Sequence, residues 1–342
     1  MKKMEKIALV ITSINKPNEV IKKYYSLSKK NNVNFIIIGD KKTPQYPSKY
    51  NFHSLKSQMK FKFTLNKSLP INSYSRKNIG YLVAMQNNSK IIIETDDDNF
   101  PKSNFYNNLE LEKKLKLLSG SKWINIFKIF QKKNKDSIWP RGFPLDEINK
   151  IHRIKTIEKL ITSPIQQRLC DGNPDVDAIF RLTKKNKFHT FEKKNYALSN
   201  KSICPFNSQN TVWHEQCFPL MYLPSYCTMR ATDIWRGFIA LRVLKNYNWN
   251  LSFLSSTVIQ NRNVHDLIDD FNLEYPVYKN TKILNDILYN LKLSNKKSYM
   301  LINFFKCYKE LVNKKILEKK ELELVYKWIS DISKIYPYYK KI

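Results

Sequence analysis

Three short apolar runs rich in β-branched residues alternate with helix-compatible segments in the first hundred residues. Residues 7–11 (IALVI), 35–38 (FIII) and 90–95 (KIIIET) are typical of strands, and residues 18–29 and 74–86 have helical spacing. Strands that alternate with helices predict an α/β fold with a mainly parallel sheet. Ligands of such sheets bind beyond the carboxyl ends of the strands, so side chains that follow these runs are candidates for a site.

The chain is strongly basic, with 60 Lys and Arg against 29 Asp and Glu and a net charge of +31 over 342 residues. Its 42% hydrophobic and 13% aromatic residues exclude a disordered polycation. A field of this sign attracts anions such as nucleotide or lipid phosphates. The sequence has no zinc-finger spacing, helix-turn-helix or RNA-recognition motif, so we do not expect nucleic acid as a partner. Nucleic-acid binding stays an alternative that rests on the charge alone.

The first apolar run is shorter than a secretory leader of roughly 15 to 30 residues, and no stretch reaches the roughly 18 apolar residues that span a bilayer. We therefore expect a cytoplasmic protein. The five cysteines are widely spaced and include no C-x-x-C pair, which predicts buried reduced thiols rather than disulfides or a zinc site.

Three consecutive acids, Asp96, Asp97 and Asp98, directly follow the strand expected at residues 90–95. In an extended segment alternate side chains share a face, so Asp96 and Asp98 are expected to point the same way. Two carboxylates on one side can bind Mn²⁺ or Mg²⁺ and leave coordination positions for a diphosphate. Such a cation neutralises the charge on the phosphate that departs when a sugar leaves a nucleoside diphosphate. The alternative is a solvated acidic turn.

Basic residues begin the helix that leads into this acidic strand. Asn72 or Ser73 can cap the helix, and Arg76 and Lys77 lie near its N-terminus, where backbone N–H groups already favour phosphate. The run at residues 75–100, SRKNIGYLVAMQNNSKIIIETDDDNF, resembles the Arg-Asn-x-Gly helix and Asp-x-Asp strand of nucleotide-sugar glycosyltransferases with the GT-A fold.

A closer resemblance covers residues 7–265 and stops before the basic tail. Six segments occur in an order that resembles the STELLO family of glycosyltransferases. They are IIIGDKKTP (36–44), LPINSYSRKNIGYLVAMQNNSKIIIETDDD (69–98), IWPRGFPLDEI (138–148), IQQRLCDGNPDVDAIFRLT (165–183), PFNSQNT (205–211) and TDIWRGFIALRVL (232–244). Plant members of that family carry a membrane anchor ahead of this region, whereas this sequence shows none, so we do not expect their secretory-pathway location here.

This resemblance implies a GT-A-like domain, which we place at residues 1–280. Beyond about Asn280 the sequence becomes helical and basic, which predicts a C-terminal extension at residues 281–342. The resemblance also implies a nucleoside diphosphate sugar as donor and a glycan or lipid-linked acceptor, in the synthesis of a surface polysaccharide or glycoconjugate. The implied metal ligands are Asp96 and Asp98. The implied nucleotide-sugar-binding residues are Thr12, Ser13, Asp40, Arg76, Lys77, Asn78, Asp97 and Arg141.

Inversion at the anomeric carbon needs a base to deprotonate the acceptor hydroxyl. Asp233 is the first candidate, since a lone acid at the start of a helix resembles the late catalytic acid of inverting GT-A enzymes. Its alternatives are a helix cap or a pair with Arg236. Asp175 is the second catalytic candidate, and with Asp177 it could face the sugar or acceptor, cap a helix or form an ion pair. His214 and His265 are further metal-ligand candidates, although lone histidines are more often structural.

Two alternatives to a transferase remain. The acidic strand with the Asn-Phe-Pro that follows it also resembles reversibly glycosylated polypeptides, which act as nucleotide-arabinose mutases, and Arg141 loosely matches the loop of their reactive arginine. The other alternative is a non-catalytic protein that binds an anionic partner. The basic tail could contact an anionic membrane at the inner face, or it could cap the α/β part and keep its charges solvated.

Overall fold

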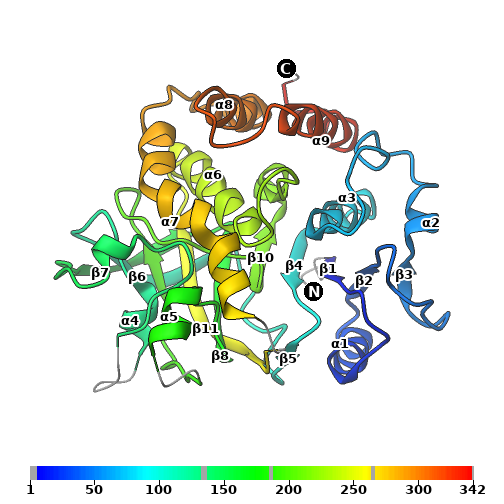
Figure 1. Cartoon of the computed structure of the whole chain (residues 1–342), viewed down its shortest axis with the longest axis horizontal. Coiled ribbons are helices and arrows are strands. Elements are labelled where there is room, and N and C mark those ends of the chain that lie inside the picture. The colour runs from blue at the N-terminus through cyan, green and yellow to red at the C-terminus, as the bar shows by residue number, and fades with distance from the viewer. Residues whose placement is uncertain (1–5, 132–136, 185–187, 263–265, 341–342) are drawn as a thin grey trace.

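A mixed β-sheet crosses the molecule (Figure 1). The computed structural model describes residues 6–131, 137–184, 188–262 and 266–340. Within them the strand order is β3-β2-β1-β4-β10-β8-β11-β9-β6-β7, and β5 pairs with β11 beside this path. The strands are β1 Ile7–Thr12, β2 Asn34–Ile38, β3 Asn51–His53, β4 Ile91–Thr95, β5 Asn99–Pro101, β6 Glu112–Ser119, β7 Lys155–Thr162, β8 Ile165–Gly172, β9 Tyr196–Leu198, β10 Asn210–His214 and β11 Leu251–Gln260.

Helices cover both faces of the sheet because its central strands are apolar on both sides. Ala8 and Val10 of β1 belong to the core cluster on the side of α3, whereas Leu9 and Ile11 belong to the cluster on the side of α1. The helices are α1 Glu19–Lys30, α2 Leu55–Gln58, α3 Lys77–Gln86, α4 Ile126–Phe130, α5 Ala178–Thr183, α6 Thr232–Asn246, α7 Leu267–Tyr289, α8 Met300–Asn313 and α9 Glu321–Ile335.

The predicted α/β class with C-terminal helices is confirmed, with one difference in the sheet. β3, β2, β1 and β4 pair in parallel, as expected. β10 then lies antiparallel between β4 and β8, so the sheet as a whole is mixed. β8 and β11 run parallel to each other and share the direction of β4. The carboxyl ends of β1, β2, β4, β8 and β11 and the start of β10 therefore meet at one edge.

A single glycine brings α3 close to the sheet. A Cβ atom on Gly80 would lie 2.5 Å from Cγ1 of Val10 and 2.9 Å from Cγ1 of Ile38, so a larger side chain would push the helix away. Ser73 caps the 3₁₀ turn η1 (Tyr74–Arg76) ahead of α3, because the Ser75 N–H donates to its Oγ at 3.3 Å. The predicted cap at this position is thus confirmed, and Tyr74 and Lys77 contact the residues at the end of β4.

A buried ion pair joins β4 to α6. Arg236 donates to Glu94 through Nη1 at 2.9 Å and Nη2 at 2.7 Å, and both side chains are almost completely buried. Trp213 Nε1 donates to the same carboxylate at 2.8 Å, and the Tyr81 hydroxyl makes a further short hydrogen bond to it. The guanidinium also lies 4.9 Å from the centre of the Trp213 ring. Glu94 is therefore compensated by one charge and two neutral donors.

The C-terminal helices pack on the α/β part rather than extend from it. Trp328 Nε1 of α9 donates to the Pro219 carbonyl at 2.9 Å, and Asp331 accepts from the backbone N–H groups of Thr64 and Leu65 at 2.8 and 2.9 Å. The structure thus favours the alternative in which the tail caps this part. The expected boundary between residues 280 and 281 falls inside α7, and the division into two domains stays a prediction. Among the described residues, none of the helices is both long and apolar enough to span a bilayer.

Substituting Arg236 tests the buried pair. Arg236→Met should lower the free energy of unfolding by about 3–5 kcal/mol, because it leaves the Glu94 charge buried and unpaired. Arg236→Met combined with Glu94→Gln removes both charges and should recover part of that loss. Urea denaturation followed by circular dichroism measures both changes. A loss below about 1 kcal/mol for the single variant would contradict the role given to this pair.

Candidate functional site

A cavity of about 490 Å³ lies at the edge of the sheet where the strand ends meet. Its walls come from the ends of β1, β2, β4 and β11, the segment before β10, the loop after β8 and the start of α6. Ten of the twelve predicted site residues line it, and Lys77 and Asn78 do not. Those ten are Thr12, Ser13, Asp40, Arg76, Asp96, Asp97, Asp98, Arg141, Asp175 and Asp233. A cavity thus lies beyond the strand ends, where the sequence predicts the site, and the roles of its residues stay predictions.

The three consecutive aspartates lie in a turn, not in an extended segment. The Asn99 N–H donates to the Asp96 carbonyl at 3.3 Å, which closes the turn between β4 and β5. We expected Asp96 and Asp98 to share a face because side chains alternate along an extended strand. That reason is wrong, since the strand ends at Thr95. Each carboxylate instead meets a different element, although all three line the cavity.

Asp98 is the least compensated of the three. Gln260 Nε2 at the end of β11 donates to Asp98 Oδ2 at 2.8 Å. Asp98 Oδ1 is buried and has no hydrogen-bond partner in the part of the chain that the structure describes. Burial, and then the nearby charge of Asp96, raise the pKa of Asp98 to about 7. An unpartnered carboxylate oxygen at a cavity wall fits a ligand that brings positive charge.

Asp96 is held from one side by the segment that begins α3. Lys77 Nζ donates to Asp96 Oδ1 at 3.0 Å, and the Tyr74 hydroxyl donates to the same oxygen at 2.8 Å. Burial raises the pKa of Asp96, while Lys77 and the hydrogen bonds oppose that rise. No hydrogen bond among the described residues involves Asp96 Oδ2. This carboxylate thus keeps one oxygen for a further partner.

Lys77 and Asn78 serve the fold around the cavity. The Lys77 ammonium also donates to the Thr95 carbonyl at 2.7 Å and to the Tyr74 oxygen at 2.9 Å, so its three N–H groups are all used. Asn78 Nδ2 donates to the Leu223 carbonyl at 2.9 Å and its Oδ1 accepts from the Leu223 N–H at 2.8 Å. Lys77 has no N–H left for a phosphate, and Asn78 is completely buried and does not line the cavity, so their nucleotide contacts stay predictions.

Asp97 and Asp40 hold the loops that would surround a nucleoside. The Ser13 hydroxyl donates to Asp97 Oδ2 at 2.5 Å, and Asn15 Nδ2 donates to the same oxygen at 3.2 Å. Asp40 accepts from the Lys41 N–H at 2.6 Å and from the Ser73 N–H at 2.9 Å. These bonds tie the end of β1 to the acidic turn, and the end of β2 to the start of η1.

Arg76 is a buried cation with neutral partners. Its Nε and Nη2 donate to Gln58 Oε1 at 2.9 and 2.7 Å, and further bonds reach the Asn66 side chain and the Leu69 carbonyl. Burial lowers the pKa of Arg76, and Asp40 opposes that shift. Since no carboxylate forms an ion pair with it within the described ranges, its charge favours an anion in the cavity.

Arg141 joins both predicted catalytic acids in one buried cluster. It donates to Asp175 through Nε at 2.9 Å and Nη2 at 2.8 Å, and to Asp233 Oδ2 through Nη2 at 3.0 Å. Despite burial, the Arg141 and Arg230 charges lower the pKa of Asp175 to about 2. Asp233 also accepts from the backbone N–H and the hydroxyl of Ser208, both at 3.2 Å. Asp233 therefore pairs with Arg141, and Arg236 pairs with Glu94 instead.

The remaining candidates lie away from the cavity. Asp177 caps α5, since the Phe180 N–H donates to it at 2.7 Å, and Trp139 Nε1 donates to its other oxygen at 2.6 Å. Its helix-cap alternative is thus confirmed. His214 lies at the opposite end of β10 from the cavity, pairs with Gln166, and has a pKa lowered to about 3 by burial and nearby cations. His265 lies outside the described residues.

Sequence reasoning missed several cavity residues that lie far apart along the chain. They are Tyr74, Ser208, Gln209, Met229, Arg230, Gln260 and Arg262. Gln260 ends the run LSFLSSTVIQ and Arg262 lies two residues beyond it; the length and β-branched content of this run would have predicted the strand that places them. Arg230 pairs mainly with Glu274 of α7, at 2.5 Å, which no local pattern indicates.

The carboxylates fit a divalent cation in their chemistry. Within the described ranges, no group of three or more His, Cys, Asp or Glu side chains is placed to hold a metal ion. Asp98 Oδ1 and Asp96 Oδ2 are hard oxygen ligands, and Mg²⁺ commonly takes one or two carboxylates and completes its shell with phosphate and water oxygens. The buried oxygen without a partner on Asp98 is the observation that favours this cation.

Removing the uncompensated charge should stabilise the protein. Asp98→Asn keeps an acceptor for Gln260 and removes a buried charge beside Asp96, so the free energy of unfolding in metal-free buffer should rise by about 1 kcal/mol. Chemical denaturation measures this. The control, Asp97→Asn, weakens a carboxylate that accepts from Ser13 and Asn15 and should lower the same quantity. A loss of stability in Asp98→Asn would show that its charge is compensated.

Comparison with known proteins gives three kinds of match: a family model, a solved structure and curated relatives. The family model for STELLO glycosyltransferases matches residues 230–342. This match includes α8 and α9, so the expectation that the resemblance stops before the tail is wrong. A remote likeness to a solved structure, the crystal structure of a mycobacterial protein, has a TM-score of 0.40 at 8% identity and covers 85% of this chain and 76% of that chain.

Two curated relatives come from Arabidopsis thaliana. Probable glycosyltransferase STELLO1 is 30% identical over 261 residues, which cover 69% of this chain and 33% of that protein. Probable glycosyltransferase STELLO2 is 28% identical over 211 residues, which cover 56% of this chain and 28% of that protein. The chain thus spans about a third of the length of the curated relatives it matches. By these matches, the chain is related to the STELLO glycosyltransferase family.

Proposed function

We propose that this α/β fold is of the GT-A type and transfers a sugar from a nucleoside diphosphate sugar to an acceptor hydroxyl. One observation carries the proposal. The cavity places carboxylate oxygens without protein partners on Asp96 and Asp98 in the same space as Arg76, a buried cation without a carboxylate partner. A diphosphate with a divalent cation complements both features, because the cation meets the carboxylates and the phosphates meet the guanidinium. The relationship to STELLO proteins supports the same reaction class.

Asp96 and Asp98 are the residues that would hold Mn²⁺ or Mg²⁺. A bound cation of this kind supplies Lewis-acid neutralisation of the charge on the leaving diphosphate. Lys77 and Tyr74 orient Asp96 through Oδ1, and Gln260 orients Asp98 through Oδ2. The protein groups therefore fix both carboxylates before the donor binds.

The nucleoside would lie at the ends of β1 and β2. Thr12, Ser13 and Asp40 line this part of the cavity, and Asp97 braces it from the acidic turn. Asp40 can accept hydrogen bonds from a ribose or a base in addition to those from Lys41 and Ser73. Arg76 lies in sequence between Asp40 and the acidic turn that begins at Asp96, and its guanidinium would face the diphosphate.

Asp233 is the proposed base, and Asp175 positions Arg141. In the transfer, the acceptor oxygen forms a bond to the anomeric carbon, the bond to the diphosphate oxygen breaks, and the hydroxyl proton passes to a carboxylate. A carboxylate whose pKa is about 2 is a weak base at neutral pH, which makes Asp175 the poorer choice. Asp175 instead fixes the guanidinium that reaches Asp233.

The geometry speaks against the mutase alternative. Arg141, in the loop that loosely matches the reactive arginine of those enzymes, is buried and held by two aspartates. Such an arginine has no free face for covalent chemistry. We further propose a role in the synthesis of a polysaccharide or glycoconjugate, with a glycan or lipid-linked acceptor. The cytoplasmic location expected from the sequence stays a prediction.

Calorimetric titration with a panel of nucleotide sugars, with and without Mn²⁺, tests the donor site. Asp96→Ala combined with Asp98→Ala should abolish metal-dependent binding, because it removes both oxygens that would hold the cation. The matched control is Asp146→Ala, an exposed acid whose side chain lies outside the cavity and pairs with Lys282. Unchanged binding in the double variant would reject the site.

The reaction itself is tested by product analysis. When the bound donor is incubated with candidate acceptors, a transferase releases the nucleoside diphosphate and forms a glycosylated product. Without acceptor, ring isomerisation of the sugar with no release of nucleotide would support a mutase instead. If no nucleotide sugar binds at any Mn²⁺ concentration, the non-catalytic alternative replaces the proposal.

A further inference from the structure

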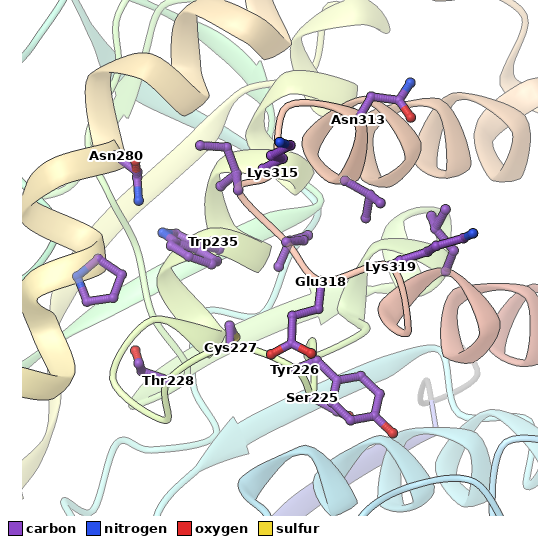
Figure 2. A pocket seen from close by; sticks show the side chains of 15 residues that line it. Ser225, Tyr226, Cys227, Thr228, Trp235, Asn280, Asn313, Lys315, Glu318 and Lys319 are labelled. Atoms are coloured by element: carbon purple, nitrogen blue, oxygen red, sulfur yellow. The ribbon is translucent and has the colours of Figure 1, made fainter.

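A second and larger cavity, about 970 Å³, lies among the C-terminal helices (Figure 2). We call it the tail groove. Its apolar lining comes from Trp235 of α6 and Pro276 of α7, from Ile316 and Leu317 of the segment that joins α8 to α9, and from Leu322 of α9. These walls are largely apolar and come from elements that the STELLO family model covers.

One short segment connects the lining of the tail groove to that of the cavity at Asp96, Asp97 and Asp98, which we call the aspartate cavity. Residues 225–228 line the groove, whereas Met229 and Arg230 line the aspartate cavity. Glu321 of α9 fixes this segment by accepting from the backbone N–H groups of Ser225 and Tyr226 at 3.0 and 2.7 Å. The Ser225 hydroxyl also donates to the hydroxyl of Ser75 at 2.7 Å, in the turn that carries Arg76. The linings of the two cavities are thus joined by one short, braced segment of the backbone.

A buried donor without a partner belongs to the groove wall. The Trp235 side chain is 3% exposed, and its Nε1 has no hydrogen-bond partner in the described part of the chain. Figure 2 shows the indole nitrogen turned toward the side of α7 that carries Asn280. A buried N–H without an acceptor costs about 1–3 kcal/mol, so a ligand oxygen that reaches it would stabilise the complex.

The groove also carries cations without ion pairs. Lys315 and Lys319 line it and form no ion pair among the residues that the structure describes. Glu318 lies between them in sequence and is the one acid among the lining residues, so the lining keeps a net charge of +1. Apolar walls with free cations and one unpartnered donor match an amphiphile with a negative head.

We propose that the tail groove binds an amphiphile that combines an apolar chain with a phosphate or carboxylate head. The chain packs against the apolar lining that Trp235, Pro276, Ile316 and Leu317 provide. The head is held by Lys315 and Lys319, and the Trp235 N–H is a further donor in the wall of the groove. This site does not depend on sugar transfer, but its place beside the segment at residues 225–230 would bring a lipid-linked acceptor next to the aspartate cavity.

Calorimetric titration with dodecyl phosphate, below its micelle concentration, tests the site. We expect one molecule to bind per chain. Lys315→Asn with Lys319→Gln should weaken binding by about tenfold or more, since both charge-assisted contacts are lost. Asn suits position 315 because the backbone there is left-handed, with φ of 58°. Trp235→Phe keeps the aromatic wall and removes the donor, and should weaken binding by about threefold.

Three controls separate the outcomes. Lys314→Gln changes a neighbouring exposed lysine that does not line the groove, and should leave binding unchanged. A comparison of the affinities for dodecanoate and for dodecyl phosphate distinguishes a carboxylate head from a phosphate head. Asp96→Ala with Asp98→Ala should retain binding of dodecyl phosphate, so a failure of the donor site and a failure of this site are distinguishable.

Each of the following results overturns the proposal. Equal binding of dodecanol would show that the head contributes nothing, and equal binding of inorganic phosphate would show that the chain contributes nothing. Binding that the Lys315 and Lys319 substitutions leave unchanged, or no binding at all, would also reject the site. Binding of a neutral oligosaccharide to the groove in place of the amphiphile would assign it to a different ligand.

Discussion

The buried pair of Glu94 and Arg236 fixes the geometry on which the candidate site depends. Glu94 lies two residues before Asp96 on the central strand, and Arg236 lies three residues after Asp233 on α6. A fully buried carboxylate requires its partner, so β4 and α6 can pack in only one relative position. The metal-ligand candidates and the candidate base are thereby both held in the wall of one cavity, where Tyr74 and Ser208 connect Asp96 to Asp233 by hydrogen bonds. The buried ion pair thus helps to set the separation between Asp96 and Asp233 on which the proposed transfer depends.

Charge is distributed very unevenly between surface and cavity. The chain carries a net charge of +31, yet six aspartates gather at the aspartate cavity, namely Asp40, Asp96, Asp97, Asp98, Asp175 and Asp233. Four arginines and one lysine line the same space, and Arg141 is shared between two of the acids. The basic surroundings draw an anion toward the opening, while the local acids require a cation to accompany it. A diphosphate with its divalent counter-ion meets both conditions.

Much of the architecture was predictable because it follows local patterns. The strands at β1, β2 and β4, the helix after Ser73 and the gathering of acids beyond a strand end all follow from spacing and from the rule for parallel sheets. What could not be predicted depends on contacts between distant residues. Ser13 and Asp97 are 84 positions apart, and Arg141 and Asp233 are 92 apart. The insertion of β10 between β4 and β8 likewise follows from no local signal.

The antiparallel insertion of β10 also has a consequence for synthesis. The four parallel strands at one end of the sheet are complete once residue 95 has been made, but the strand that pairs with the free side of β4 ends at residue 214. During translation the nascent chain therefore exposes an apolar β4 margin, IIIET, for more than a hundred residues. Such an unpaired strand edge is a template for unwanted strand pairing until β10 has been made and covers it.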